Sequence, residues 1–229
     1  VLCVAGIARA LWGSTVGIAA GWVYLASPFP YFGAFVVTVD VLLTLFVAAA
    51  VWCYCEARRA PNRLGWVLGF WLACGLGFMT KGPLVLLPLV PLFIWHHRSG
   101  RPCRIYHPAG LAAFAISGFW WYAVIFYRHP ELFHYYWKEE MLDRMTGRVS
   151  DETTHNRQWY RPFQMYLPVL TVGAGVWIYY GGWVFVGQQL WKPRAVWTAL
   201  KEKSESGWLL LWLLLPLAIF FVAKSRLHL

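Results

Sequence analysis

The sequence predicts an all-α fold, a polytopic bundle of transmembrane helices. Of its 229 residues, 59% are apolar and only 13% are charged, whereas soluble domains carry roughly 45–50% apolar and about 25% charged residues. Aromatic residues make up 19% and include 16 tryptophans, which suits the aromatic belts at the two membrane–water interfaces. These proportions exclude an ordinary soluble domain, and the high hydrophobicity excludes a disordered chain.

Apolar runs separated by proline, glycine and arginine define the elements in order. A membrane-spanning helix needs roughly 20 apolar residues, and seven runs approach that length. The predicted spans are Leu11–Ala26, Phe35–Tyr54, Leu64–Met79, Pro83–Trp95, Ala109–Phe126, Met165–Val186 and Gly207–Val222. Val1–Ala8 resembles the end of a further span. We expect residues 1–229 to form a single transmembrane domain, part of a longer multipass protein.

The net charge of +10 resides mainly in the connections between these spans. One set of alternate connections carries eleven cations, including Arg58, with three acids, including Glu205, and the other set carries nine cations with seven acids. The more basic side is predicted to be cytoplasmic by the positive-inside bias. Because the cations lie in short loops, we interpret them as setting orientation and expect no nucleic-acid partner. Asp40, Lys81, residues 127–164 and the tail from Lys224 then share the non-cytoplasmic side.

Asp40 and Lys81 are ionisable residues within or between apolar runs, where a charge is costly. Asp40 lies in VVTVDVLLTLF, and we interpret it either as a site carboxylate or as an acid that caps the start of a helix. Lys81, in GFMTKGPLVLL, joins two runs of about 20–24 Å, which are shorter than the ~30 Å hydrocarbon layer. We therefore expect the hairpin tip to lie below the outer surface, where the ammonium binds a phosphate or carboxylate. The alternative is a lysine that snorkels from a helix end.

The connection 127–164 is too long for a simple loop between spans. Pro130, at a first helical position, predicts an amphipathic interfacial helix that runs to about Met145 in this non-cytoplasmic loop. Glu140 and Arg144 are four residues apart in the order that favours an ion pair on a helix surface. A surface salt bridge is therefore the alternative to a functional role for these two residues.

Three further residues carry open interpretations. His155 has acidic neighbours but lacks the paired-histidine spacing of a metal site, which leaves both a metal ligand and a surface residue possible. Lys224 and Arg226 follow the last span, either as interfacial anchors or as part of an anion site. The five cysteines fit no disulfide or zinc framework and are interpreted as small apolar residues.

Five motifs in series resemble those of the GT-C glycosyltransferases, in particular the bacterial transferases that add aminoarabinose to lipid A and their protein O-mannosyltransferase relatives. The motifs are TVDVLL, GLGFMTKGP, HPELFHYYWKEEMLDRM, WYRPF with YLPVL, and FFVAKSRL. They occur in matching order over essentially the whole chain. The resemblance implies a multipass enzyme of the bacterial inner membrane that takes a sugar from a polyprenyl phosphate. It implies transfer to a lipid, glycan or protein acceptor on the periplasmic side.

The resemblance also implies roles for single residues. Asp40 matches the acidic residue that opens a mid-chain span and is assigned a catalytic role, in orienting the acceptor or the sugar. Glu140 is the supporting acid of the E-x-x-x-R pattern, and His155 matches a loop histidine associated with a divalent metal in some members. Cleavage of the sugar–phosphate bond builds negative charge on the leaving phosphate, which cations stabilise. The cations assigned to the donor phosphate are Lys81, Arg144, Arg157, Lys224 and Arg226.

Some family motifs have no counterpart among these residues. An Asp-Glu pair, whose Asp is the presumed catalytic base, and a Lys-Pro motif precede the position of Val1 in the usual order. The Pro-Trp that commonly follows the YLPVL span reads Val176-Trp177 here. These departures motivate an alternative, a catalytically incomplete relative that serves as a structural or binding subunit of a membrane complex with other membrane proteins. A transporter would require inverted repeats with broken helices in both halves, and the sequence contains one such hairpin.

Overall fold

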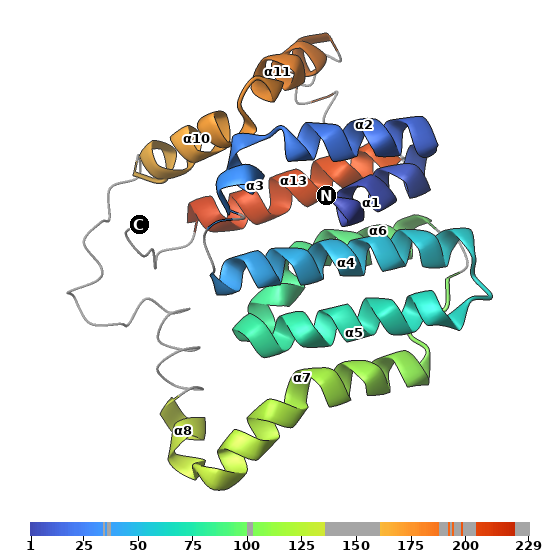
Figure 1. The fold of residues 1–229 in the computed structure, drawn as a ribbon, viewed down its shortest axis with the longest axis vertical. Coiled ribbons are helices and arrows are strands. Elements are labelled where there is room, and N and C mark those ends of the chain that lie inside the picture. Colours follow the sequence, from blue (N-terminus) through green and yellow to red (C-terminus); the bar gives the residue numbers. More distant parts are fainter. Residues whose placement is uncertain are drawn as a thin grey trace.

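The computed structural model describes residues 1–33, 35, 38–99, 103–135, 161–187, 192, 194, 198 and 205–222. Within these ranges the fold is helical and contains no strand, as the sequence predicted (Figure 1). The helices are α1 (Leu2–Trp12), α2 (Ser14–Leu25), α3 (Pro28–Gly33), α4 (Val39–Arg59), α5 (Leu64–Lys81), the 3₁₀ helix η1 (Gly82–Leu89), α6 (Val90–Ser99), α7 (Pro108–Arg128), α8 (Pro130–Tyr135), α10 (Arg161–Ala174), α11 (Trp177–Gly187) and α13 (Glu205–Val222).

The long helices form an antiparallel bundle. Helix α5 packs between α4 and α7, and the chain then turns back so that η1 and α6 pack behind α4 and α5 (Figure 1). The pair α1–α2 lies on the other side of α4, and α13 packs on η1 and α6. Consecutive helices therefore pack as neighbours, which is the arrangement that short connections favour.

Three described stretches are long and apolar enough to cross a membrane: Val39–Arg59, Leu64–Arg98 and Pro108–Arg128. The second stretch consists of α5, η1 and α6, which reverse direction after Lys81. Shorter apolar helices cover Leu2–Trp12, Ser14–Leu25 and Gly207–Pro216. The described residues thus form a helical membrane domain with three candidate spans, and the predicted count of about seven is not confirmed.

Glycines with positive φ set two helix boundaries that the predicted spans missed. The chain turns at Gly13, with φ of 97°, so the boundary between α1 and α2 lies inside the predicted span Leu11–Ala26, most of which forms α2. Gly175, with φ of 58°, divides the predicted span Met165–Val186 into α10 and α11. A positive φ ends a helix and is readily adopted by glycine. The predicted helix boundaries were wrong because hydropathy does not report the positive φ of these glycines.

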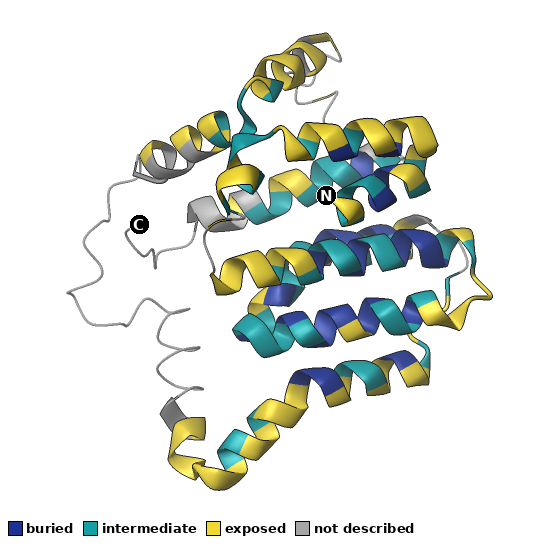
Figure 2. Cartoon of the chain, viewed as in Figure 1, coloured by how far each residue is buried: buried dark blue, intermediate teal, exposed yellow. Residues whose placement is uncertain are grey.

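The buried core lies where α4, α5, η1 and α6 meet (Figure 2). Its fully buried side chains include Val51, Tyr54, Phe70, Leu89 and Leu92. By contrast, the outer half of α7 is mostly exposed (Figure 2), as expected for a helix surface that faces lipid. The core therefore fixes α4 against α5 and α6. Because these helices run from one end of the bundle to the other, the core also positions the residues at both ends.

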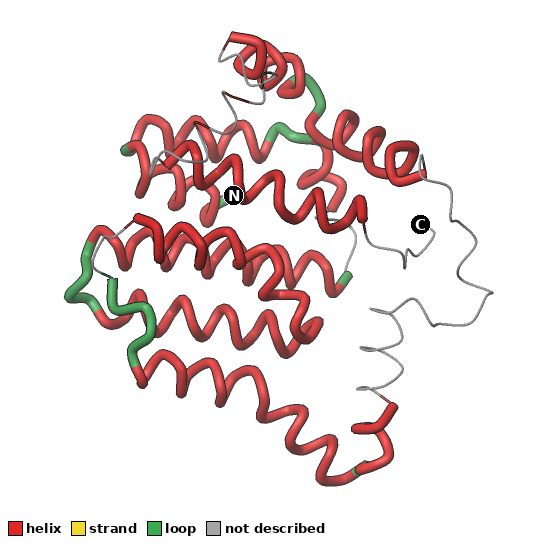
Figure 3. Tube along the Cα trace, turned by 180° about the vertical axis from the view of Figure 1, so that it is seen from behind, coloured by secondary structure: helices red, strands yellow, loops and turns green. Residues whose placement is uncertain are grey.

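The two ends of the bundle differ in charge. The loops 60–63 and 103–107 lie together at one end (Figure 3), where α4 ends at Arg59 and α6 carries Arg98. Helix α4 begins, and helices α5 and α7 end, at the opposite end (Figure 1). We call these the Arg58 end and the Lys81 end. The described helices thus place Lys81 away from the cluster of arginines, as counting the spans predicted.

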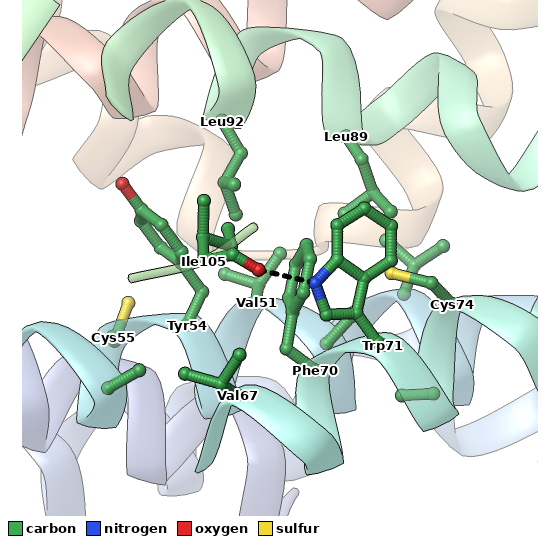
Figure 4. Packing of buried hydrophobic residues seen from close by; sticks show 14 of the residues in the cluster. Val51, Tyr54, Cys55, Val67, Phe70, Trp71, Cys74, Leu89, Leu92 and Ile105 are labelled. Carbon is green, nitrogen blue, oxygen red and sulfur yellow. Dashed lines mark hydrogen bonds between the residues drawn. The ribbon is translucent and has the colours of Figure 1, made fainter. Parts of the chain in front are cut away.

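The loop at the Arg58 end is tied to the core by a tryptophan. Trp71 Nε1 donates a hydrogen bond of 2.5 Å to the carbonyl oxygen of Ile105 (Figure 4). Both residues are buried, at 7% and 1% exposure. A buried carbonyl needs such a partner, so this contact fixes the connection between α6 and α7 against α5.

Candidate functional site at the Lys81 end

Asp40 and Lys81 form an ion pair at the Lys81 end of the bundle. The Lys81 ammonium contacts Asp40 Oδ1, although 41 residues separate the two in sequence. The Asp40 side chain is 63% exposed and that of Lys81 is 37% exposed. Two of the predicted site residues therefore lie in direct contact, and within the described part of the chain both are accessible from outside.

The start of α4 positions the carboxylate. Thr38 precedes the helix in an extended conformation, and Asp40 lies in the first turn. The Thr44 hydroxyl donates to the Asp40 carbonyl oxygen at 2.8 Å, within the same helix. An acid in a first turn is stabilised by the helix dipole. This position is compatible with both interpretations of Asp40, so its role stays a prediction.

A tight reversal after α5 positions the ammonium. Lys81 is the last residue of α5, and Gly82 follows with φ of 63°, a conformation that other residues rarely adopt. The Gly82 N–H bonds to the Phe78 carbonyl oxygen and closes the helix. The chain then folds back so closely that a Cβ on Gly77 would lie 2.5 Å from Val85 Cγ2. Lys81 is thus held at the tip of a hairpin, as the Gly82-Pro83 pair predicted.

Helix α7 supports the end of α5 from the other side. A Cβ on Gly75 would lie 1.9 Å from Ser117 Oγ and 2.9 Å from the Phe114 carbonyl oxygen, so the two helices approach as closely as small residues allow. One turn later, the Tyr122 hydroxyl donates to the Phe78 carbonyl oxygen at 3.3 Å. The last two turns of α5 are therefore enclosed between α7 and η1.

The supporting role of Gly75, Gly77 and Tyr122 was not predicted from the sequence. A usable signal was present in the GLG of the GLGFMTKGP motif. Residues two apart on a helix differ in direction by about 200°, so two such glycines allow two neighbours to approach on nearly opposite faces. For Tyr122 the chain offers no comparable local signal, because its partner is a carbonyl oxygen 44 residues away.

The junction of α7 and α8 adds polar groups at this end. His129 Nδ1 lies 3.2 Å from Glu131 Oε1, and both side chains are exposed. The pKa of Glu131 is lowered from its ordinary value, first by a hydrogen bond from its own backbone N–H and then by His129. The predicted interfacial helix from Pro130 begins as α8, and its described part ends at Tyr135.

The remaining predicted site residues lie outside the described residues. They are Glu140, Arg144, His155, Arg157, Lys224 and Arg226. Among the described residues, no group of three or more histidine, cysteine, aspartate or glutamate side chains is arranged to hold a metal ion. The divalent metal at His155 therefore stays a prediction from the resemblance.

The ion pair is chemically suited to exchange of anions. An ammonium with three donors at an accessible hairpin tip can exchange one carboxylate oxygen for a phosphate oxygen. Exchange costs little here, because exposed ion pairs typically stabilise a protein by only about 0–1 kcal/mol. A phosphate that takes Lys81 would also leave the Asp40 carboxylate available to accept a hydrogen bond from a hydroxyl group.

Comparison with known proteins identifies relatives along the whole chain. Residues 1–122, more than half of the chain, match the family model described as dolichyl-phosphate-mannose-protein mannosyltransferase. The chain is 32% identical over 196 residues to the undecaprenyl phosphate-alpha-4-amino-4-deoxy-L-arabinose arabinosyl transferase of Erwinia tasmaniensis, covering 82% of this chain and 32% of the relative. A second such transferase, from Pseudomonas fluorescens Pf-5, is 33% identical over 195 residues, covering 82% and 30%.

A third relative, from Sodalis glossinidius, is 29% identical over 236 residues and covers 99% of this chain and 40% of its own length. The chain thus spans about a third of the length of the curated relatives that it matches. No solved structure matches it. On the family match and these relatives, the chain belongs to the dolichyl-phosphate-mannose-protein mannosyltransferase family of GT-C membrane glycosyltransferases.

Proposed function

We propose that this chain is the part of a membrane glycosyltransferase that binds the phosphate of a polyprenyl-phosphate sugar. The relatives are undecaprenyl phosphate-alpha-4-amino-4-deoxy-L-arabinose arabinosyl transferases, so the proposed donor is undecaprenyl phosphate carrying 4-amino-4-deoxy-L-arabinose. The observation that carries the proposal is the ion pair between Lys81 and Asp40. It supplies a cation for the donor phosphate and a carboxylate for a sugar or acceptor hydroxyl at one point of the bundle.

Lys81 has the properties that a phosphate ligand needs. Breaking the sugar–phosphate bond transfers an electron pair to the leaving phosphate oxygen, and a cation beside that oxygen stabilises the charge that develops. Gly82 and the close contacts of Gly75 and Gly77 fix the backbone that carries Lys81. A fixed cation loses little by reorganisation when the charge appears. In this proposal Lys81 binds the donor phosphate and stabilises it as the leaving group.

Asp40 takes a second role once the phosphate is bound. The carboxylate is 63% exposed and lies in contact with the ammonium that the phosphate would occupy. We assign it to orient a hydroxyl of the sugar or the acceptor. The resemblance assigns proton abstraction from the acceptor to the Asp of the family's Asp-Glu pair, so we do not assign that step to Asp40.

The proposed topology completes this assignment. About seven spans, with an interfacial helix within residues 127–164, would put the Lys81 end on the periplasmic face of the bacterial inner membrane. The concentration of arginines at the opposite end supports this orientation through the positive-inside bias. Membrane lipids then surround the bundle, and the remaining cations assigned to the donor phosphate, from Arg144 to Arg226, would act at the same face.

The alternative function, a catalytically incomplete subunit of a membrane complex, has less support. The curated relatives over most of the chain are themselves described as transferases. Sequencing the gene upstream of Val1 separates the two functions. An Asp-Glu pair after a first span supports the enzyme, and an open frame without one supports the subunit.

The proposal is tested by the affinity of the protein, as its gene encodes it, for undecaprenyl phosphate. Lys81→Ala removes a charge-assisted hydrogen bond worth about 1.5–3 kcal/mol, which corresponds to a loss of roughly 10- to 150-fold in affinity. Lys81→Arg keeps the charge and is the matched control, with a smaller loss expected. Unchanged affinity in Lys81→Ala, in protein that inserts normally, removes Lys81 from the donor site.

A further inference from the structure

A buried cluster at the Arg58 end joins α13 to the core, far from the Asp40–Lys81 pair. Arg58 has only 5% of its side chain exposed, and its guanidinium carbon lies 3.6 Å from the centre of a Trp95 ring. Arg58 Nη1 donates to Glu205 Oε2 at 3.5 Å. On the same side, the rings of Trp95 and Trp208 stack at 4.8 Å with an angle of 17° between their planes.

Three helices contribute to this cluster. Arg58 lies in the last turn of α4, Trp95 in α6, and Glu205 and Trp208 in the first turn of α13. Trp212 extends the stack by one turn of α13, with its ring 5.7 Å from that of Trp208 and nearly parallel to it. A buried cation over an indole face contributes about 2 kcal/mol or more when it is desolvated. The first turn of α13 is therefore fixed both in rotation and along its axis.

Two comparisons of helix length show where the C-terminal end of α13 lies relative to the Asp40–Lys81 pair. Asp40 precedes Arg58 by 18 residues on α4, about 27 Å at 1.5 Å per residue, and Val222 follows Glu205 by 17 residues on α13, about 26 Å. Because the two helices are joined where α4 ends and α13 begins, α13 ends at about the depth of Asp40.

The second comparison uses the helices that α13 contacts directly. From Trp95 back to Gly82 the chain rises about 24 Å, taking 2.0 Å per residue for η1 and 1.5 Å for α6. From Trp208 to Val222 the rise is about 21 Å. The difference is less than one helical turn, so both comparisons bring the end of α13 to the level of the Lys81 hairpin.

We propose that Arg58, Trp95, Glu205 and Trp208 form a register clamp, a set of positioning residues that fixes the depth and rotation of α13 relative to the Asp40–Lys81 pair. Lys224 and Arg226 follow Val222 in the sequence and lie outside the described residues. The clamp fixes the helix that leads to them. Its importance for donor binding rests on the proposed function, whereas its control of α13 does not.

The test compares insertions on the two sides of the clamp. Nitroxides are placed on unnatural amino acids at the exposed positions Leu42 and Ala218 of the protein as its gene encodes it, and their separation is measured by double electron–electron resonance. Two alanines inserted between Lys203 and Ser204 precede the clamp, and we expect them to leave the distance unchanged. Two alanines inserted between Trp212 and Leu213 follow it.

The second insertion shifts the label at Ala218 by about 3 Å along the axis and rotates it by about 200°, across a helix roughly 10 Å wide. We expect a clear change of distance. In an Arg58→Leu background, the insertion before Ser204 should also change or broaden the distance. Arg59→Leu is the matched control, since Arg59 is half-exposed and pairs with Glu56. In this background the insertion before Ser204 should leave the distance between the labels unchanged.

Equal shifts from the two insertions overturn the clamp. If Arg58→Leu yields no folded protein, the two insertions in the wild-type background still test the clamp. Trp208→Ala then takes the place of Arg58→Leu as the substitution that disrupts it. Undecaprenyl phosphate affinity is measured on the same variants. Distances that change as expected without a change of affinity support the clamp and contradict the assignment of donor phosphate binding to the end of α13. Roughly tenfold weaker binding in the second insertion alone supports both.

Discussion

Substitution of Gly75 by alanine tests whether the close approach of α5 and α7 holds the lysine hairpin. The added Cβ would lie 1.9 Å from Ser117 Oγ and 2.9 Å from the Phe114 carbonyl oxygen. Ordinary contact begins near 3.4 Å. The serine hydroxyl can rotate away only by giving up its hydrogen bond to the Ala113 carbonyl oxygen at 2.7 Å. The Phe114 carbonyl is backbone, so α7 itself must retreat by about half an ångström.

The magnitude follows from three opposing terms. Overpacking costs about 1–3 kcal/mol, and the lost serine hydrogen bond costs about 1 kcal/mol. Alanine regains about 1 kcal/mol of helix propensity relative to glycine. The net loss for Gly75→Ala is therefore about 1–3 kcal/mol. For a protein of this size each kcal/mol lowers the melting temperature by about 2–4 °C.

The assay is thermal unfolding of the purified protein in detergent, with Gly65→Ala as the control in the same helix. A Cβ on Gly65 meets nothing within 4 Å among the described residues, so we expect no loss of stability. Gly75→Ala should unfold several degrees lower, and adding Ser117→Ala should recover part of the loss. Equal melting temperatures for the Gly75 and Gly65 variants would refute the close packing of α5 on α7.

Three further substitutions test the Asp40–Lys81 pair, the contact that supports the end of α5, and a buried ion pair at the Arg58 end. Asp40→Asn should bind undecaprenyl phosphate more tightly than wild type, because the carboxylate that competes for Lys81 is gone. Sugar transfer should fall at least tenfold, because the carboxylate that orients the hydroxyl is lost. Weaker phosphate binding contradicts the exchange at Lys81. Tyr122→Phe removes the hydrogen bond to the end of α5 and should cost about 1 kcal/mol, read as a small fall in melting temperature. Glu56→Gln should cost about 1–3 kcal/mol, because the buried carboxylate is ion-paired on both sides; an unchanged melting temperature contradicts this.

The sequence predicted the helical class, and it placed Asp40 and Lys81 on the same side of the membrane, which agrees with their contact at one end of the bundle. Both follow from hydropathy and from counting spans, which need no knowledge of how helices rotate about their axes. Direct contact between the two residues was not predictable, because it depends on the rotation of α4 and α5 relative to each other. That rotation is set by core residues such as Val51 and Phe70, whose partners are distant in sequence.

The Arg58 end shows a different limit of sequence reasoning. Arg58 and Glu205 were counted as loop charges that set orientation, although both lie within helices and Arg58 is buried. Positive-inside counting treats every cation alike and cannot separate an arginine in water from one beneath an indole ring. A usable signal was the presence of Trp95 in α6 and of Trp208 and Trp212 near the start of α13, since aromatic faces favour burial of a guanidinium.

The two ends of the bundle place their cations in opposite environments, and this difference favours the Lys81 end as the site of exchange. Arg58 is enclosed by aromatic rings and a carboxylate, so an incoming anion would have to displace packed side chains before reaching it. Lys81 and Asp40 remain accessible among the described residues, and their ion pair adds little to stability. A phosphate can therefore replace Asp40 at the ammonium while the core contacts of α4 and α5 stay in place. For the proposed binding and release of a lipid phosphate, Lys81 has the suitable environment, because its backbone is fixed and its counter-ion holds it only loosely.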